Sequence, residues 1–257
     1  MSDANTAAHP ARLWQRHTLT EKLIRTAFWL GIGIAVALSL QHINVIWEFL
    51  WDAPEQMLDM VQRMYPPDYA YYRLEVHAAL LETFHIATLG TLFALVAALP
   101  LSILAAHNLT PNRALNFLAK TLLVASRSVN SLVWALLFIA IFGPGALAGT
   151  VAIACRSVGF IGKLLGEALE EVPRGSIEAL KAAGATQSSQ ILYGYWPAVK
   201  PAFWSIMLLR WDINVRESSV LGLVGAGGIG MIMQSAIELF EWDRVAVILL
   251  TIFAVVV

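Results

Sequence analysis

The sequence predicts an all-α integral membrane protein, and three observations support this fold class. Of the 257 residues, 58% are hydrophobic and only 14% are charged, whereas globular domains carry about 25% charged residues. The mean hydropathy is +0.66. The charged residues are also spaced so that long apolar stretches lie between them, and a helix needs about 20 such residues to cross a bilayer.

The charge balance and the single cysteine exclude several kinds of function. Lys and Arg number 17 against 18 Asp and Glu, for a net charge of −1, so the chain has no basic excess for nucleic-acid phosphates. The one cysteine, Cys155, rules out an intrachain disulfide and a zinc cluster of thiolates. The histidines are far apart in sequence and suggest no local metal pair. We therefore expect no nucleic-acid partner, and no metal or cofactor bound by this chain.

Two apolar stretches in the first half of the chain predict transmembrane helices. Residues 26–47 form the first, and no small-residue cleavage site marks it as a signal peptide. A second span is expected over about residues 84–106, directly after Glu82. Pro100 lies inside this span, where neighbouring helices can compensate for the lost backbone hydrogen bond.

The second half of the chain predicts four more apolar helices. Gly143-Pro144-Gly145 is a turn signal, and it divides a long apolar region into helices over about residues 115–142 and 146–169. A fifth helix is expected over about residues 201–224. The last apolar run, residues 245–257, is shorter than the length of a span. We expect the chain to stop there before the natural end of a sixth span.

The distribution of charge between the spans predicts their orientation, because loops rich in Lys and Arg stay in the cytoplasm. Residues 1–25 are predominantly basic and form a cytoplasmic N-terminal segment. Residues 48–82 are rich in acids and aromatic side chains, which predicts a periplasmic loop after the first transmembrane helix, residues 26–47. The remaining residues, 83–257, form the transmembrane domain, with a polar cytoplasmic loop over residues 170–200.

One stretch of the cytoplasmic loop indicates a docking element. The sequence Glu178-Ala-Leu-Lys-Ala-Ala-Gly184 is rich in alanine, a strong helix former. Gly184 can adopt the positive φ that ends one short helix and turns the chain into the next. The expected product is a compact helix–turn–helix knob that fills a cleft on a partner, although such a loop could also be amphipathic without any partner.

This stretch resembles the coupling loop of ABC importer permeases. That loop reads Glu-Ala-Ala, three residues, Gly, nine residues, then Ile-x-Leu-Pro. Here Glu178, Ala179, Gly184 and Pro197 stand at matching positions, and the resemblance implies that they contact an ATPase subunit. Three positions depart from the pattern: Leu180, Gly194 and Trp196.

A wider resemblance is to phosphonate importer permeases (PhnE-type), over most of residues 60–257. It is most specific for Asn214-Val-Arg216 followed by Ser219-Val-Leu-Gly-Leu-Val-Gly-Ala-Gly-Gly-Ile-Gly230, and it includes Arg127-Ser-Val-Asn130. It implies a six-span type I ABC importer permease fold (MetI-like). Members of that family usually continue into a basic tail, which agrees with the expected truncation at Val257.

Two glycine patterns look like nucleotide sites and are interpreted differently. Gly225, Gly227, Gly228 and Gly230 fit the dinucleotide fingerprint, but that fingerprint requires a βαβ unit. We expect them to be structural glycines in a closely packed turn. No complete phosphate-binding loop occurs in the sequence. The chain is therefore not expected to be an enzyme, and ATP and Mg would be used by a separate ATPase subunit.

Charged residues within the spans suggest a path for an anion, because an oxyanion needs a wet route lined by donors. The candidate substrate path consists of Arg127, Asn130, Asn214 and Arg216. Pairing is the alternative: Asp212 and Arg216 are four residues apart and can neutralise each other. Arg210 and Glu217 are two helical turns apart, which we interpret as too far for a direct pair.

The resemblance implies a complete transport machine in the bacterial inner membrane. Two copies of this chain would form the pore, two ATPase subunits would dock on the loops, and a periplasmic phosphonate-binding protein would deliver the cargo. Phosphite, hypophosphite or phosphate are alternative cargoes, and methionine or a quaternary amine agree less well with the motifs. An ion-coupled secondary transporter is a different class, and a membrane enzyme would need a catalytic constellation that the sequence lacks.

Overall fold

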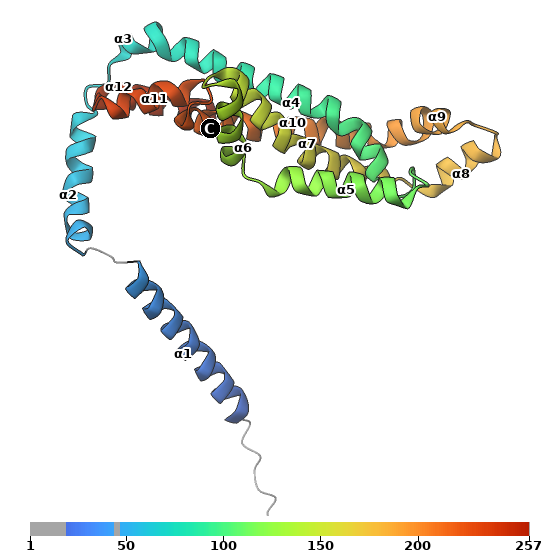
Figure 1. The fold of residues 1–257 in the computed structure, drawn as a ribbon, viewed down its shortest axis with the longest axis horizontal. Helices are drawn as coiled ribbons and strands as arrows, with labels where there is room; N and C mark the ends of the chain where they lie inside the picture. Colours follow the sequence, from blue (N-terminus) through green and yellow to red (C-terminus); the bar gives the residue numbers. More distant parts are fainter. Residues whose placement is uncertain (1–18, 44–46, 257) are drawn as a thin grey trace, which may run out of the picture. The chain divides into compact units, whose positions relative to one another are not determined.

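The computed structural model describes residues 19–43 and 47–256 (Figure 1). Every regular element in these residues is helical, so the all-α prediction is confirmed for them. The chain divides into two compact units, Met1–Asp59 and Met60–Val257. Most of the predicted cytoplasmic segment, residues 1–18, lies outside the described residues, as do residues 44–46 of the predicted first span and the last residue, 257.

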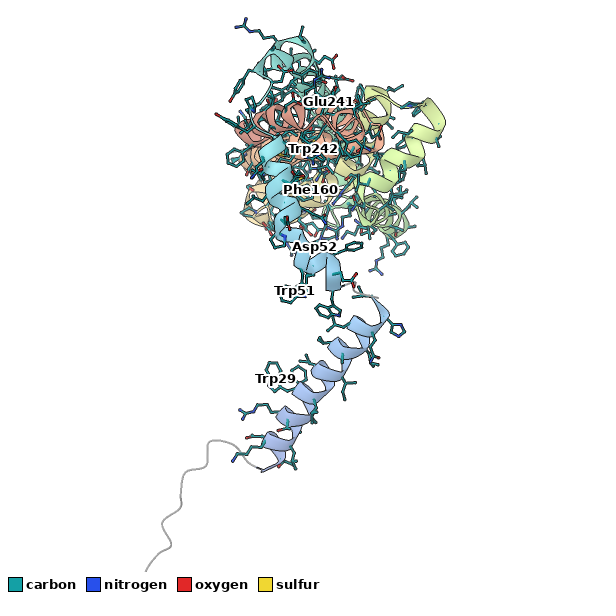
Figure 2. All side chains as sticks on the ribbon, turned by 90° about the vertical axis from the view of Figure 1, so that its left-hand side faces the viewer. Trp29, Trp51, Asp52, Phe160, Glu241 and Trp242 are labelled. Carbon is teal, nitrogen blue, oxygen red and sulfur yellow. The ribbon has the colours of Figure 1, made fainter. Side chains whose placement is uncertain are left out.

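The first unit contains helix α1, Leu19–His42. The sequence predicted this helix over residues 26–47, so the structure begins it earlier and ends it earlier. The reason is that uncharged stretches mark the hydrocarbon core, whereas a helix can continue past the lipid through charged residues such as Lys22 and Arg25. Figure 2 shows side chains on all sides of α1, Trp29 among them. No residue in the apolar part of α1 that could cross a membrane is buried.

The predicted loop over residues 48–82 is largely helical in the structure. It contains α2, Trp47–Arg63, then α3, Tyr69–Tyr71, and a π-helical turn, Tyr72–Val76, which runs directly into α4, His77–Ala105. The second predicted span therefore begins well before residue 84. Charge argues against a span over such a segment, but it carries no information on whether the backbone there is helical.

Three long helices pack side by side in the second unit: α4, α7 (Ala146–Glu170) and α10 (Trp196–Leu221) (Figure 1). Small residues allow the close approach, as is usual between membrane helices. A Cβ at Gly90 of α4 would lie 2.7 Å from Ile153 Cγ2 of α7. On its other side α7 packs against α5, where a Cβ at Gly162 would lie 2.5 Å from Leu123 Cδ2.

The single helix predicted over residues 115–142 is wrong, because the chain breaks there into α5 (Arg113–Ser128) and α6 (Ser131–Phe142). The two axes differ by 89°. Asn130 causes the break as the N-cap of α6, since its side chain accepts a hydrogen bond from the backbone N–H of Leu132 at 3.2 Å. The indole of Trp134 donates to the Ser126 carbonyl at 3.3 Å, which satisfies an acceptor at the end of α5.

The chain continues after α10 through a 3-10 turn, Gly222–Val224, into α11 (Ile229–Glu238) and α12 (Trp242–Val256). Within the described residues, four segments are long and apolar enough to cross a membrane: Thr20–His42, Tyr69–Ala105, Ala146–Glu170 and Gln187–Glu238. The bent pair α5–α6 makes a fifth if it counts as one span. The predicted count of six spans is therefore not confirmed.

Candidate functional site

The coupling segment, defined here as residues 174–197, projects beyond the end of the helical bundle (Figure 1). It consists of α8 (Arg174–Ala182), α9 (Gln187–Gln190) and a π-helical turn, Ile191–Tyr195, that leads into α10. The predicted helix–turn–helix shape is confirmed.

The turn between α8 and α9 is fixed by a Schellman motif around Gly184. The N–H of Gly184 donates to the Lys181 carbonyl and that of Ala185 to the Leu180 carbonyl, both at 3.0 Å. Gly184 has φ +79°, a left-handed conformation that other residues adopt only at a cost. The predicted positive φ is confirmed, and it closes α8 without using any side chain.

One face of α8 packs against the π-helical turn. Ile177 is 4% exposed and shares an apolar cluster with Tyr195 and Val199. A Cβ at Gly194 would lie 2.6 Å from Ile177 Cδ1 and 3.0 Å from Leu180 Cδ1. Two of the departures from the family pattern therefore meet in space: the larger Leu180 lies opposite the smaller Gly194.

The other face of α8 and its turn are open to solvent. Glu178, Ala179 and Gly184 are exposed, and no atom lies within 4 Å of a Cβ placed on Gly184. Pro197 is exposed in the first turn of α10, directly after the π-helical turn, where the N–H of Trp196 donates to the Ile191 carbonyl. All four sequence-predicted coupling residues are thus accessible to a partner.

The coupling segment is joined to the bundle through the loop between α4 and α5, residues 106–112. The side-chain amide of Gln187 donates to the Leu109 carbonyl at 3.1 Å. On the other side of the loop, Asn108 donates to the Leu169 carbonyl at the end of α7, at 2.8 Å. A displacement of α9 would therefore be transmitted to α4, α5 and α7 together.

Glu170 closes this connection, and sequence reasoning missed it as a site residue. Its Oε1 accepts from the backbone N–H of His107 at 3.0 Å and lies 2.9 Å from His107 Nδ1 and 3.2 Å from Lys120 Nζ. A pocket of about 290 Å³ separates this cluster from α8. The available signal was a carboxylate at the predicted end of a helix, which alone does not identify its partners.

A second polar region lies inside the bundle. The side-chain amide of Asn214 on α10 donates to Thr91 Oγ1 of α4 at 2.8 Å. Ser157 Oγ of α7 donates to Asn214 Oδ1 at 3.1 Å and accepts from Arg210 Nε at 2.9 Å. All four residues are at most 2% exposed. We call this chain of contacts, with the ion pairs that continue it, the polar network; it links α4, α7 and α10.

Ion pairs extend the polar network towards α6. Arg210 Nη2 lies 3.3 Å from Glu217 Oε2, and Arg156 Nη1 lies 3.5 Å from Glu217 Oε1 and 3.3 Å from Ser131 Oγ. The expectation that Arg210 and Glu217 are too far apart to pair is wrong. Seven residues advance a helix by about 10.5 Å but return to nearly the same face, so the two long side chains can extend towards each other and meet.

The four residues of the candidate substrate path do not converge on one place. Arg127 is exposed at the end of α5, and Asn130 caps α6 just beyond it. Asn214 is buried in the polar network, and Arg216 is exposed and paired with Asp212. The described residues contain no group of three or more His, Cys, Asp or Glu able to hold a metal ion.

The residues interpreted as structural glycines lie in a closely packed turn. Gly225, Gly227 and Gly228 have φ values of +93°, +88° and +73°. The carbonyl of Gly225 accepts from the N–H of Gly145 at 2.9 Å, and a Cβ at Gly228 would lie 2.5 Å from Thr83 Oγ1. Gly230 packs against the Ser219 carbonyl. The turn therefore docks directly onto α4 and the α6–α7 turn.

Comparison with known proteins identifies the family to which this chain is similar. A family model described as "Binding-protein-dependent transport system inner membrane component" matches residues 98–257. The phosphite transport system permease protein PtxC of Stutzerimonas stutzeri is 39% identical over 191 residues, which cover 74% of this chain and 69% of that protein.

Two further matches are a relative with a longer chain and a solved structure with lower sequence identity. The phosphate-import permease protein PhnE of Mycolicibacterium smegmatis is 33% identical over 226 residues, covering 88% of this chain and 42% of that protein. Among solved structures, an inward-facing MetNI methionine ABC transporter chain aligns with a TM-score of 0.60 at 20% identity, covering 70% of this chain and 90% of that chain. The structural match concerns the fold.

Proposed function

Because the chain belongs to the family of binding-protein-dependent transport system inner membrane components, we propose that, as the permease subunit of an ABC importer, it carries a phosphorus oxyanion across the inner membrane. The observation that carries this proposal is the exposed coupling segment, with small residues around a Schellman turn at Gly184. Phosphite and phosphate are named for two relatives, and the Asn214–Gly230 stretch resembles phosphonate permeases.

The family implies an ATPase subunit and a substrate-binding protein as partners. In the proposed assembly two copies of this chain enclose the path, since a symmetric dimer is the commonest way to double the helices. Two ATPase subunits dock on Glu178, Ala179, Gly184 and Pro197, and they alone use ATP and Mg. A periplasmic protein delivers the anion, and the basic N-terminal segment, residues 1–25, lies in the cytoplasm.

The contacts of the coupling segment support a mechanism for its movement. Closure of the ATPases would displace α8, whose buried Ile177 packs on Tyr195 at the start of α10. The same movement would reach α4, α5 and α7 through Gln187, the loop over residues 106–112 and Glu170. The long helices would then alternate between outward and inward access.

The cargo itself sets a requirement for the path. Moving an anion through a medium of ε about 4 costs tens of kcal/mol, so the route must be wet and must offer donors. Arg127 and Asn130 are exposed at the bend between α5 and α6, which favours them for this role. Asn214 and Arg216 already have partners within the chain; in this scheme they contribute by releasing those partners as the helices move.

The test is reconstitution of the full chain in lipid vesicles with its ATPase subunit and binding protein. We expect labelled phosphite or phosphonate to enter only with ATP, and uptake to disappear in Gly184→Pro while the permease still inserts. A second variant, Arg127→Gln in the candidate substrate path, should lower uptake without lowering ATP hydrolysis. Uptake that persists without ATP would make the chain a self-sufficient carrier, and competition by methionine but not by phosphite would refute the cargo.

A further inference from the structure

Helix α2, Trp47–Arg63, has two faces of different chemistry. At about 100° of rotation per residue, its four acids fall within about 60° of the helix circumference: Glu48, Asp52, Glu55 and Asp59. A separate arc of about 120° carries six large apolar residues, each at least 59% exposed: Trp47, Leu50, Trp51, Met57, Leu58 and Val61. Trp51 and Asp52 are labelled in Figure 2.

No residue of α2 is buried by the described part of the chain. Trp51 is 81% exposed and Met57 is 64% exposed, so the apolar arc faces outward along the whole helix. An apolar surface of this size is unfavourable when it faces water. Tryptophan favours the membrane–water boundary, because its ring is apolar and its N–H can still reach water.

The chain on both sides of α2 restricts how the helix can lie. The candidate span that precedes α2 ends at His42, and the next candidate span begins at Tyr69. The intervening chain therefore leaves and re-enters the bilayer on the same side. A helix of 17 residues is about 25 Å long at 1.5 Å per residue.

The connection from α2 to the helical segment that contains the next candidate span is short. Residues 64–68 could cover at most about 18 Å if fully extended, and they are folded into turns instead. The N–H of Tyr65 donates to the Gln62 carbonyl at 3.2 Å, and that of Tyr69 to the Pro67 carbonyl at 3.0 Å. Met64 packs against an apolar cluster of the second unit. The C-terminal end of α2 is thus held close to the start of the helical segment that continues into α4.

We propose that α2 is an in-plane anchor that lies in the interface of the outer leaflet, with the apolar arc in the acyl boundary and the acidic face towards water. The inference rests on α1 and α4 each crossing the bilayer once, and it does not depend on the cargo. Interfacial helices usually present Lys or Arg to anionic lipids. Here the polar face is acidic, so the anchor is held by its apolar area and does not require anionic lipid.

The experiment places one nitroxide label at a time on the full chain, assembled with its ATPase in vesicles, in a Cys155→Ala background. Leu58→Cys and Met57→Cys report on the apolar arc, and Glu55→Cys and Asp52→Cys are matched controls on the acidic face. We expect labels on the arc to collide with oxygen and to be shielded from a water-soluble nickel complex. Labels on the acidic face should show the reverse, with a difference of several-fold.

The result should be the same in phosphatidylcholine vesicles and in vesicles containing phosphatidylglycerol. Equal access of the nickel complex to both faces would overturn the proposal, because α2 would then stand in water. Labels on the arc that neither oxygen nor nickel reaches would also overturn it, because a protein surface would cover the helix. A label at Leu30 of α1 tests the premise: if nickel reaches it, α1 is not a span and the inference fails.

Discussion

The polar network and the coupling segment are both rich in polar residues, yet they are built in opposite ways. In the network Thr91, Ser157 and Asn214 are buried and joined by side-chain hydrogen bonds. In the coupling segment the turn is made by backbone bonds around Gly184, and Glu178, Ala179 and Pro197 remain exposed. Charge within the bundle therefore serves mainly to hold helices together, whereas the surface offered to a partner consists of accessible residues without such partners inside the bundle.

This comparison predicts that substitutions in the two regions act on different measurements. A network residue that loses its partner leaves a polar group in a dry place, which lowers the free energy of unfolding. An exposed coupling residue has few side-chain contacts to lose in the isolated permease, so its substitution should mainly separate ATP hydrolysis from transport. The following variants test the distinction, beginning with the largest effect on stability.

Arg210→Leu should destabilise the permease by about 3 kcal/mol, at the low end for removing one partner of a buried pair, because Glu217 keeps Arg156 at 3.5 Å. The midpoint of thermal unfolding in detergent measures it. Arg216→Leu is the matched control on the same helix: its partner Asp212 is exposed, and the loss should stay below about 1 kcal/mol. Equal losses in the two variants would contradict a structural role for the network.

Gly194→Ala should cost about 1–3 kcal/mol, the range for adding a methyl group to a filled space. The new Cβ would lie 2.6 Å from Ile177 Cδ1 and 3.0 Å from Leu180 Cδ1. Leu180→Ala in the same chain should restore part of the loss, and a double-mutant cycle of unfolding midpoints measures the coupling. Strict additivity would show that Leu180 and Gly194 do not share this space.

Gly184→Ala should cost about 1–2 kcal/mol, because an L-residue is strained at positive φ, and it should uncouple ATP hydrolysis from uptake. Gly175→Ala is the matched control within α8: Gly175 is exposed, has nothing within 4 Å of a Cβ and has no positive φ. Its stability and transport should be unchanged or improved. The ratio of anion transported to ATP hydrolysed is the measurement, and a normal ratio in Gly184→Ala would argue against this turn as the coupling point.

Glu170→Gln should have the smallest effect, about 0.2–1 kcal/mol, because Lys120 and His107 are largely exposed. The amide oxygen can still accept from the N–H of His107, so mainly the charge is lost. The unfolding midpoint of the unmodified chain should fall with salt more steeply than that of the variant, since the variant lacks one of the exposed charged pairs that salt screens. An equal salt dependence in the two chains would show that Glu170 contributes none of it.

Much of the architecture could be predicted from local sequence. Helical character followed from long apolar stretches, and the turn at Gly184 followed from an alanine-rich helix ending in glycine. The packed turn over Gly225 to Gly228 could be predicted for the same reason, because several glycines in a row fit only where backbones approach closely or φ is positive. These features depend on neighbours in sequence, which the sequence displays directly.

The remaining features depend on side-chain geometry or on partners that are distant in sequence. The bend at Asn130 lies in a stretch without charged residues, and its capping hydrogen bond to Leu132 explains it. Glu170 meets His107 from 63 residues away. The pair Arg210–Glu217 lies on one helix, and the expected spacing between Cα atoms did not include the length of the two side chains. Pairs such as Glu170–His107 depend on how the helices pack, which a single sequence does not display.

The ion pair between Arg156 and Glu217 has a consequence for the biogenesis of the protein. Arg156 lies within the span Ala146–Glu170 and its acidic partner within the segment Gln187–Glu238. At about 5–20 residues per second, the ribosome needs roughly 3–12 s to synthesise the segment between them. During that time the insertion machinery holds an arginine whose placement in lipid costs about 2.5–3.5 kcal/mol. Pairing with Glu217 offsets this cost, so we expect α7 to be held more stably in the bilayer once α10 has been synthesised.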